Sequence, residues 1–310
     1  MTEATVDLPT GIRLTYETFG PADAEPLLLV MGLGGPMTWW HLDLCAQLAA
    51  RGFLVIRFDN RDIGHSSRVP ARTRPNRRSL LRAYVGDRRS VPYTLDDMAD
   101  DSFGLLDALG IDGAHVTGVS MGGMIAQTMA LAKPDRVRSL VSIMANTGNR
   151  RVGWQHPRLL RLLVQPPART RDEYLERAPA TWAAIGSGGR YATPDDEIRR
   201  RAGETWDRAH DRGGATRQTL AVVAQPDRTA GLARLRVPTC VVHGLSDRLV
   251  HSSGGRATAR AVPGAELVLV PGMAHDLPRP LWPVFTDAID RTAARARMAA
   301  ASGQRIPTQK

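Results

Sequence analysis

The chain has 310 residues, 43% hydrophobic and 23% charged, an ordinary composition for a globular protein with one sizeable core and an insertion. No run approaches the roughly 18 apolar residues that cross a bilayer, and no basic stretch precedes an apolar run at the N-terminus. Two isolated cysteines, Cys45 and Cys240, have no metal-site spacing and make no disulfide framework. We therefore expect no membrane segment, no secretory signal, no metal and a cytoplasmic setting.

The formal net charge of +10 raises the question of a nucleic-acid partner. Nearly all of the excess is arginine, because the only lysines are Lys133 and Lys310. The arginines are scattered, with a local concentration between Arg68 and Arg89. Only one aromatic residue, Tyr84, is interleaved there, so a stacking platform for bases is absent. We interpret the charge as a solvated surface and predict no nucleic-acid partner.

The first part of the chain predicts a hairpin followed by two buried strands. Strand-like residues 5–8 and 12–19 are separated by Pro-Thr-Gly, a turn sequence. The continuous apolar runs at 26–31 and 53–58 are typical of strands buried on both faces. The amphipathic segment 37–51 between them predicts a helix.

Residues 61–92, rich in Pro, Arg, Ser and Gly, predict a long surface loop. After it, Thr94 and Asp97 form a capping pattern that opens a helix, and Gly110 ends it. A strand at 115–119, a helix at 121–132 and a strand at 137–144 follow. This alternation predicts an α/β fold with a mostly parallel sheet and helices on both of its faces.

Residues 148–234 contain helical patterns and no buried-strand pattern. Thr170 opens a capping box, Thr193 is followed by Pro and two acids, and a further helix is expected at 215–224. We predict that this segment is a helical cap inserted into a core made of residues 1–147 and 235–298.

The strand pattern returns at 237–244 and 267–270, with a helix at about 255–261 between the two strands. A last helix is predicted at about 280–298, and residues 299–310 are predicted to be a flexible tail.

The strongest chemical signal is Gly-Val-Ser-Met-Gly at 118–122, which lies between a predicted strand and a predicted helix. In that context the motif forms a tight turn that exposes the serine hydroxyl above the sheet. Gly118 and Gly122 must lack side chains because other backbone passes close by. The start of the following helix directs N–H groups toward the place where negative charge develops in acyl transfer. We predict that Ser120 is a nucleophile rather than an ordinary capping serine.

A serine nucleophile needs a base, usually a histidine held by a carboxylate, and in this type of turn the order is Ser, acid, His. His275 follows the strand at 267–270 and fits best. His243 ends a strand and is interpreted as structural. His251 shares its loop with the best acid candidate, too close along the chain for the usual geometry.

Asp247 is the predicted acid, because it stands just after the strand at 237–244. Asp276 is interpreted as a cap of the last helix, and Asp59 precedes Ser120 and breaks the order. Asn146 follows the strand after the nucleophile but carries no charge.

The oxyanion donors are expected to be backbone amides. One is the N–H of Met121, and the other comes from the glycine loop 32–35, where Leu33 is the predicted donor. This loop lacks the G-x-G-x-x-G spacing, so we predict no dinucleotide and no other cofactor.

These features together resemble the α/β-hydrolase superfamily over about residues 5–298. The match rests on the 31–35 glycine loop, the sequence Asp-Asn-Arg-Asp-Ile-Gly-His-Ser at 59–66, the Ser120 turn, and the Asp247 and His275 loops. The Asn-Arg-Asp turn at 60–62 and the helical cap are similar to bacterial anthracycline (aclacinomycin) methylesterases. Many relatives have His-Gly where this chain has Met31-Gly32, so a polar contact near the pocket is missing.

The resemblance implies a serine hydrolase that cleaves the carboxylic ester of a small molecule through an acyl-enzyme. Family members that use the same triad as lactonases, C–C hydrolases or perhydrolases stay open as alternatives, as does a non-catalytic ligand-binding protein on this fold. Oligomeric state is not readable from the sequence. Aromatic residues beside the oxyanion loop and in the cap are candidate substrate contacts or, singly, cap packing; the candidates are Trp39, Trp40, Trp182 and Trp206.

Overall fold

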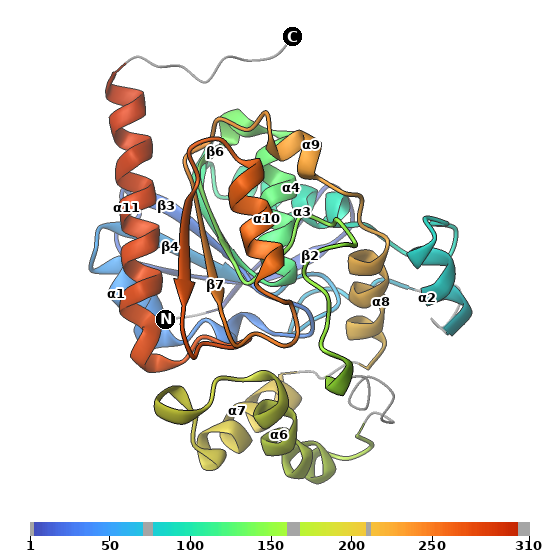
Figure 1. Cartoon of the computed structure of the whole chain (residues 1–310). Helices are drawn as coiled ribbons and strands as arrows, with labels where there is room; N and C mark the ends of the chain where they lie inside the picture. The colour runs from blue at the N-terminus through green and yellow to red at the C-terminus, as the bar shows by residue number, and fades with distance from the viewer. Residues whose placement is uncertain (1–2, 71–76, 160–167, 209–211, 303–310) are drawn as a thin grey trace.

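The computed structural model describes residues 3–70, 77–159, 168–208 and 212–302. At its centre lies an eight-stranded sheet with the order β1-β2-β4-β3-β5-β6-β7-β8 (Figure 1). β1 pairs with β2 and β2 with β4 in antiparallel fashion, and every other pair is parallel, which confirms the predicted mostly parallel sheet. The strands are β1 (Ala4–Asp7), β2 (Arg13–Phe19), β3 (Glu25–Val30), β4 (Phe53–Phe58), β5 (Ala114–Val119), β6 (Val137–Ile143), β7 (Thr239–Gly244) and β8 (Glu266–Val270).

Helices cover both faces of the sheet (Figure 1). Alternate residues of β3 show why its apolar run is continuous, because successive side chains point to opposite faces. Leu27 and Leu29 pack with the residues of α1 and α11, whereas Leu28 and Val30 pack with those of α3 and α4. The helices of the core are α1 (Leu42–Ala49), α2 (Arg77–Tyr84), α3 (Leu95–Ala108), α4 (Met121–Ala132), α10 (Ser253–Ala261) and α11 (Trp282–Ala301), with short 3₁₀ turns η1 (Met37–Trp39), η2 (Pro134–Arg136) and η5 (Arg279–Leu281).

Helix α3 begins where the sequence predicts. Thr94 and Asp97 form a complete capping box, in which the Thr94 side chain accepts from the Asp97 N–H and the Asp97 carboxylate accepts from the Thr94 N–H at 2.7 Å. Gly110 has φ +68° just after the helix, as expected of a helix-ending glycine.

The predicted surface loop at 61–92 is wrong in two respects. It contains α2, whose Ala83 packs against Leu220 and Ala224, in and just after the later helix at residues 212–223. Its first two residues, Arg61 and Asp62, are buried. The composition of the segment is that of a loop and did not predict either feature. Helix α2 is stabilised by a helix more than a hundred residues away in sequence.

The described residues of the 148–234 segment form only helices and loops: η3 (Pro157–Leu159), α6 (Arg171–Ile185), η4 (Gly189–Tyr191), α7 (Asp195–Asp207), α8 (Arg212–Val223) and α9 (Thr229–Leu232). Only α6 and α7 pack on one another away from the sheet, through Ala178, Ile198 and Ala202 (Figure 1). Helix α8 packs against α2, and α9 packs against α4 and α10. Residues 212–232 therefore pack with the core, and only α6 and α7 form a separate layer among the described residues of this segment.

Two predicted helix ends differ from the structure. Helix α7 is capped by Pro194, which has no side-chain acceptor, rather than by Thr193. Helix α11 continues to Ala301, past the predicted start of the tail at Ala299, because alanine is the residue with the highest helix propensity. Residues 303–310 of the predicted tail lie outside the described residues.

Two buried ion pairs connect the insertion to the turn after β4. Arg208, at the end of α7, donates to Asp59 at 2.8 Å, and Arg217 of α8 donates to Asp62 at 2.7 Å. Both aspartate side chains are fully buried. Asp59 also accepts from the N–H groups of Met37 and His65. The insertion is thus tied to the turn that precedes α2 and to the loop before α1.

Replacing Arg208 with Gln is expected to lower the free energy of unfolding by about 3 kcal/mol, because Asp59 would be left as a buried charge without its cation. Urea unfolding followed by circular dichroism measures this change. Arg171→Gln is the matched control, since its partner Asp207 forms an exposed ion pair that water screens. Equal stability losses in the two variants would contradict the anchoring role of Arg208.

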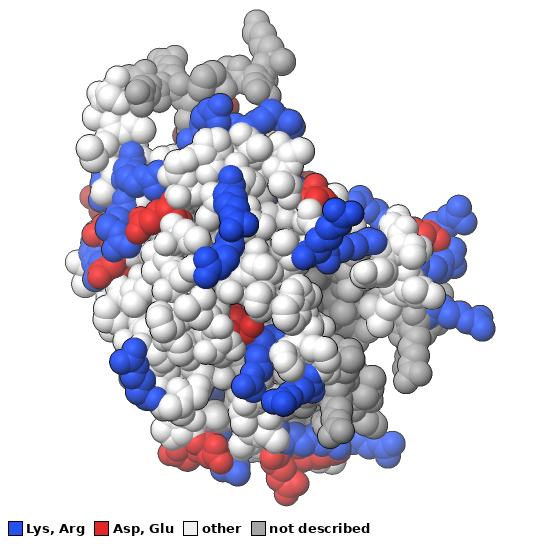
Figure 2. Space-filling model, in the orientation of Figure 1, with Lys and Arg blue, Asp and Glu red and all other residues white. Residues whose placement is uncertain are grey.

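Among the described residues, none of the helices has the length and apolar character needed to cross a membrane. On the face drawn in Figure 2, basic side chains are spread out with uncharged surface between them. The absence of a nucleic-acid partner stays a prediction.

Candidate active site

Ser120 lies in the turn between β5 and α4 and has the left-handed φ of +55° with ψ −120°. For a residue other than glycine this backbone conformation is strained and persists only where the surroundings enforce it. A Cβ on Gly118 would lie 2.1 Å from the carbonyl oxygen of Gly122, and one on Gly122 would lie 2.1 Å from that of Val30. The two motif glycines are therefore required by the close approach of backbone on both sides of the serine.

The structure brings Ser120, His275 and Asp247 together from three separate loops. His275 follows β8, and its Nε2 lies 2.9 Å from Ser120 Oγ. Its Nδ1 lies 2.7 Å from Oδ2 of Asp247, which follows β7. Because β5, β7 and β8 are parallel strands of one sheet, the loops at their carboxyl ends meet at the same edge.

Asp247 is held as a carboxylate. Its side chain is fully buried, which by itself disfavours the charged form, but interactions with His275 and His243 outweigh burial and hold the pKa of Asp247 well below its usual range. Oδ1 accepts from the N–H groups of Leu249 and Val250, both at 2.9 Å. These donors fix the orientation of the carboxylate, so that Oδ2 remains directed at His275.

The two rival histidines have other surroundings than His275. His243 is buried, and its Nε2 lies 2.8 Å from the carbonyl oxygen of Val250 and 3.4 Å from Asp247. His243 thus contacts both ends of the loop 247–250 and holds it in place. His251 stacks on Trp154 with ring centroids 4.4 Å apart.

The rival acids also have other partners. Asp276 does not cap the last helix as expected. It accepts a hydrogen bond of 2.5 Å from Ser187 Oγ, which in turn accepts from the N–H of Ala274. Burial raises the pKa of Asp276. Asn146 accepts from the N–H of Gly148 at 2.9 Å, and Asp59 belongs to the ion pair with Arg208.

The glycine loop after β3 lies against the serine. A Cβ on Gly32 would be 3.3 Å from the Cβ of Ser120, which puts Leu33 beside this serine. In the part of the chain that the structure describes, the N–H groups of Leu33 and Met121 have no hydrogen-bond partner. Two free backbone donors near a serine hydroxyl are the requirement for an oxyanion site.

Gln218 of α8 is a residue that sequence reasoning missed. Its side chain is fully buried, its Oε1 accepts from the N–H of Gly34 at 2.9 Å, and its Nε2 donates to the carbonyl of Arg61 at 3.0 Å. The insertion thus fixes the residue next to Leu33. No local pattern indicates this contact, which joins residues 184 apart.

Gln218→Leu is expected to lower kcat for ester hydrolysis about tenfold, because a shift of the Leu33 N–H would weaken the binding of negative charge in the transition state. KM should change less. Steady-state kinetics measure the effect, with Gln47→Leu on the exposed side of α1 as the control. If kcat stays at the wild-type value, Gln218 has no positioning role.

The four candidate tryptophans have different surroundings. Trp40 is completely buried in the core cluster that contains residues of α1 and α11, so the proposed substrate contact is wrong there. Trp39 donates from Nε1 to Thr205 and lies 5.8 Å from Trp182, centroid to centroid. Trp206 packs on Tyr174 at 5.5 Å.

A cavity of about 230 Å³ lies between the oxyanion loop and the insertion. Its walls include Leu33 and Trp39 from the core side and Tyr174, Thr205 and Arg208 from α6 and α7. Trp182 and Trp206 do not line it but contact residues that do. Trp182 therefore packs behind Trp39 on the core side of the cavity, and Trp206 packs behind Tyr174 on the insertion side.

Neither cysteine takes part in this site. Burial raises the pKa of Cys45 and of Cys240 to about 12, so both stay protonated thiols and poor nucleophiles. Among the described residues, no group of three or more His, Cys, Asp or Glu side chains could hold a metal ion.

Comparison with known proteins identifies the family of this chain. The family model of the alpha/beta hydrolase fold matches residues 25–278. The chain is 31% identical over 291 residues to a rhodomycin D methylesterase of Streptomyces sp., covering 86% of this chain and 90% of that protein. It is 28% identical over 287 residues to a rhodomycin D methylesterase of Streptomyces peucetius, with the same two coverages.

Among solved structures, the enol-lactonase of Burkholderia xenovorans has a TM-score of 0.72 at 22% identity, covering 94% of this chain and 100% of that chain. This likeness concerns the fold alone. The two methylesterases agree with the predicted enzyme class, a carboxylic ester hydrolase. The match over residues 25–278 and the relative at 31% identity show that the chain belongs to the α/β hydrolase fold family.

Proposed function

We propose that this protein is a serine esterase in which Ser120 is the nucleophile, His275 the general base and Asp247 the residue that orients His275. The observation that supports this most is the continuous hydrogen-bond series from Asp247 through His275 to a serine held at positive φ. Leu33 and Met121 are proposed to donate their N–H groups to the oxyanion.

In the first step, His275 Nε2 takes the Ser120 proton while Oγ attacks the ester carbonyl carbon. The carbonyl oxygen becomes an oxyanion and is stabilised by the two backbone donors. The imidazolium is stabilised by the carboxylate of Asp247. His275 then gives its proton to the leaving alcohol, and an acyl-serine remains.

In the second step, a water molecule gives a proton to His275 and its oxygen attacks the acyl carbon. The same two donors stabilise the second oxyanion. His275 returns the proton to Ser120 Oγ as the acyl–oxygen bond breaks, and the carboxylic acid leaves. The protein ends in its starting protonation state, so the cycle needs no cofactor.

We propose that the substrate is the methyl ester of a small molecule. Two relatives are methylesterases, and the smaller cavity is lined by Leu33, the proposed oxyanion donor. Its volume of about 230 Å³ is below the roughly 300–1,000 Å³ of sites that enclose a drug-sized ligand. It would therefore receive the part of the substrate beside the scissile carbonyl rather than a whole polycyclic molecule.

A panel of substrates tests this proposal: aromatic methyl esters, p-nitrophenyl acetate, and five- and six-membered lactones. We expect methanol release from the methyl esters and a kcat/KM for them above that for the lactones. A preference for lactones would favour the lactonase alternative. Labelling of Ser120 by a fluorophosphonate without turnover of any substrate would instead favour a non-catalytic binding protein.

A further inference from the structure

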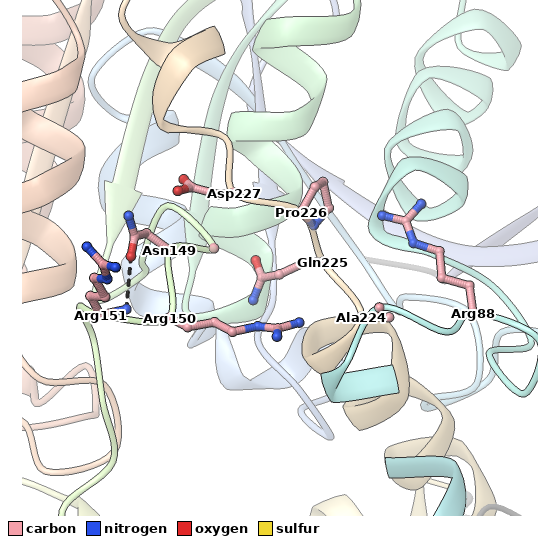
Figure 3. A pocket seen from close by; sticks show the side chains of 10 residues that line it. Arg88, Asn149, Arg150, Arg151, Ala224, Gln225, Pro226 and Asp227 are labelled. Carbon is pink, nitrogen blue, oxygen red and sulfur yellow. Dashed lines mark hydrogen bonds between the residues drawn. The ribbon is translucent and has the colours of Figure 1, made fainter. Parts of the chain in front are cut away.

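A second, larger cavity lies away from the proposed catalytic residues. Its volume is about 510 Å³, within the range of small-molecule sites. It is formed by Gly86 and Arg88 after α2, residues 148–151 after β6 and residues 224–227 between α8 and α9 (Figure 3). Neither the Ser120, His275 and Asp247 group nor the oxyanion loop lines it.

The lining carries an excess of positive charge. The lining includes three arginines, Arg88, Arg150 and Arg151, and one carboxylate, that of Asp227. Within the described residues none of the three arginines forms an ion pair with Asp or Glu. Asp227 itself accepts from the N–H of Thr229 at 2.9 Å and from its hydroxyl at 2.5 Å. Figure 3 shows this carboxylate turned away from Arg88 and Arg150.

Two guanidinium groups approach the cavity from opposite sides. Figure 3 shows Arg150 extended across the opening toward Ala224, and Arg88 on the other side with its guanidinium turned toward Pro226. Arg150 also lies over the ring of Tyr84, 4.4 Å from the centroid. Stacking on one face fixes a guanidinium while its in-plane N–H donors stay available.

Both amide side chains of the lining also present donors. The Oε1 of Gln225 accepts from Nη1 of Arg228 at 2.9 Å, and the Oδ1 of Asn149 accepts from the N–H of Arg151 at 2.9 Å. Because the oxygen of each amide is already bonded, the NH₂ groups remain as donors. Figure 3 shows the NH₂ group of Gln225 beside Arg150, whereas that of Asn149 points away from Arg88 and Arg150.

Arg228 holds Gln225 in this orientation. It is buried, and it also donates to Gln127 and to the carbonyl of Asn146. Burial lowers the pKa of Arg228 to about 10, which leaves it positively charged at neutral pH. Its charge adds to the positive potential behind the cavity wall.

We propose that this cavity binds a small oxyanion, a phosphate monoester or a carboxylate, between Arg88 and Arg150, with the NH₂ group of Gln225 as a further donor. The site is separate from Ser120. The inference is independent of the proposed esterase activity, because it rests on donors that the catalytic group does not use.

Isothermal titration calorimetry with phenyl phosphate, at low ionic strength, tests the proposal on the full chain. We expect one site per chain and a Kd that weakens with added salt. The double variant Arg88→Gln/Arg150→Gln should weaken Kd about tenfold or more, since both charge-assisted contacts are removed. Thermal unfolding shows whether the variant is folded, which we expect because both side chains are exposed.

The matched control is Arg260→Gln, which removes the same charge from an exposed position on α10. It should bind phenyl phosphate as the wild type does. An unchanged Kd in the double variant, or an equal loss in the control, would overturn the proposal. So would binding of heparin alone, with none of phenyl phosphate. Benzoate measured in parallel distinguishes the two classes of ligand. A phosphate site should bind benzoate more weakly than phenyl phosphate, and a carboxylate site should bind the two equally. Ester turnover is not a readout, so a failure of the esterase proposal would leave this result unaffected.

Discussion

Ser120→Ala is expected to lower kcat for p-nitrophenyl acetate by roughly a million-fold, the loss found when a serine nucleophile is removed from a triad. Without the hydroxyl group no acyl-serine can form. His275 Nε2, which lies 2.9 Å from Oγ in the wild type, then has no hydroxyl proton to accept. Steady-state hydrolysis followed by p-nitrophenolate absorbance measures the loss.

The matched control is Ser246→Ala, an exposed serine in the same loop as Asp247. It should keep wild-type turnover and be labelled by a fluorophosphonate, whereas Ser120→Ala should not be labelled. A Ser120→Ala protein with wild-type kcat would refute the assignment of the nucleophile.

Asp247→Asn is expected to lower kcat about ten-thousand-fold, although the substitution changes one atom. In the wild type, Asp247 Oδ2 accepts the Nδ1–H of His275 at 2.7 Å, which leaves Nε2 free to accept the Ser120 proton. An asparagine amide can donate to Nδ1 and so favours the wrong tautomer of the imidazole. The charged form of His275 also loses its carboxylate.

The control for Asp247 is Asp276→Asn, because Asp276 adjoins His275 in sequence but binds Ser187. We expect its kcat to stay within about tenfold of the wild type. If Asp276→Asn were the more damaging change, the acid would be assigned to the wrong residue.

The pH dependence of stability provides a further readout for Asp247→Asn. The folded-state pKa of Asp247 is lowered, so its carboxylate contributes stability above the unfolded value of about 3.9, and this contribution is lost as pH falls through the folded pKa. The stability deficit of Asp247→Asn should therefore be complete at pH 7 and shrink below about pH 4. A deficit that is constant with pH would mean that the charge of Asp247 is unimportant for folding.

Much of the arrangement around Ser120 could be predicted because it depends on local features. The turn is specified by glycines two residues before and two residues after Ser120, together with a strand before it and a helix after it. Asp247 and His275 could be chosen because each lies on the loop after a late strand, and the carboxyl ends of parallel strands meet at one edge.

The errors arose where a side chain's partner is distant in sequence. Trp40 has the same composition cues as Trp39 beside it, and only packing against α1 and α11 buries one and leaves the other at the cavity. Asp276 resembles a helix cap, yet Ser187 from the end of α6 accounts for its orientation.

By itself, then, the sequence determined the mostly parallel sheet, the turn at Ser120 and the positions of Asp247 and His275 after two late strands, because these follow from residue periodicity and strand ends. Only the tertiary structure decided what surrounds them. The contact of Gln218 with Gly34 and the pairing of Arg208 with Asp59 each join segments more than a hundred residues apart. The second cavity likewise combines three segments between residues 86 and 227. No short-range pattern encodes such contacts, since they form only when the insertion packs against the core.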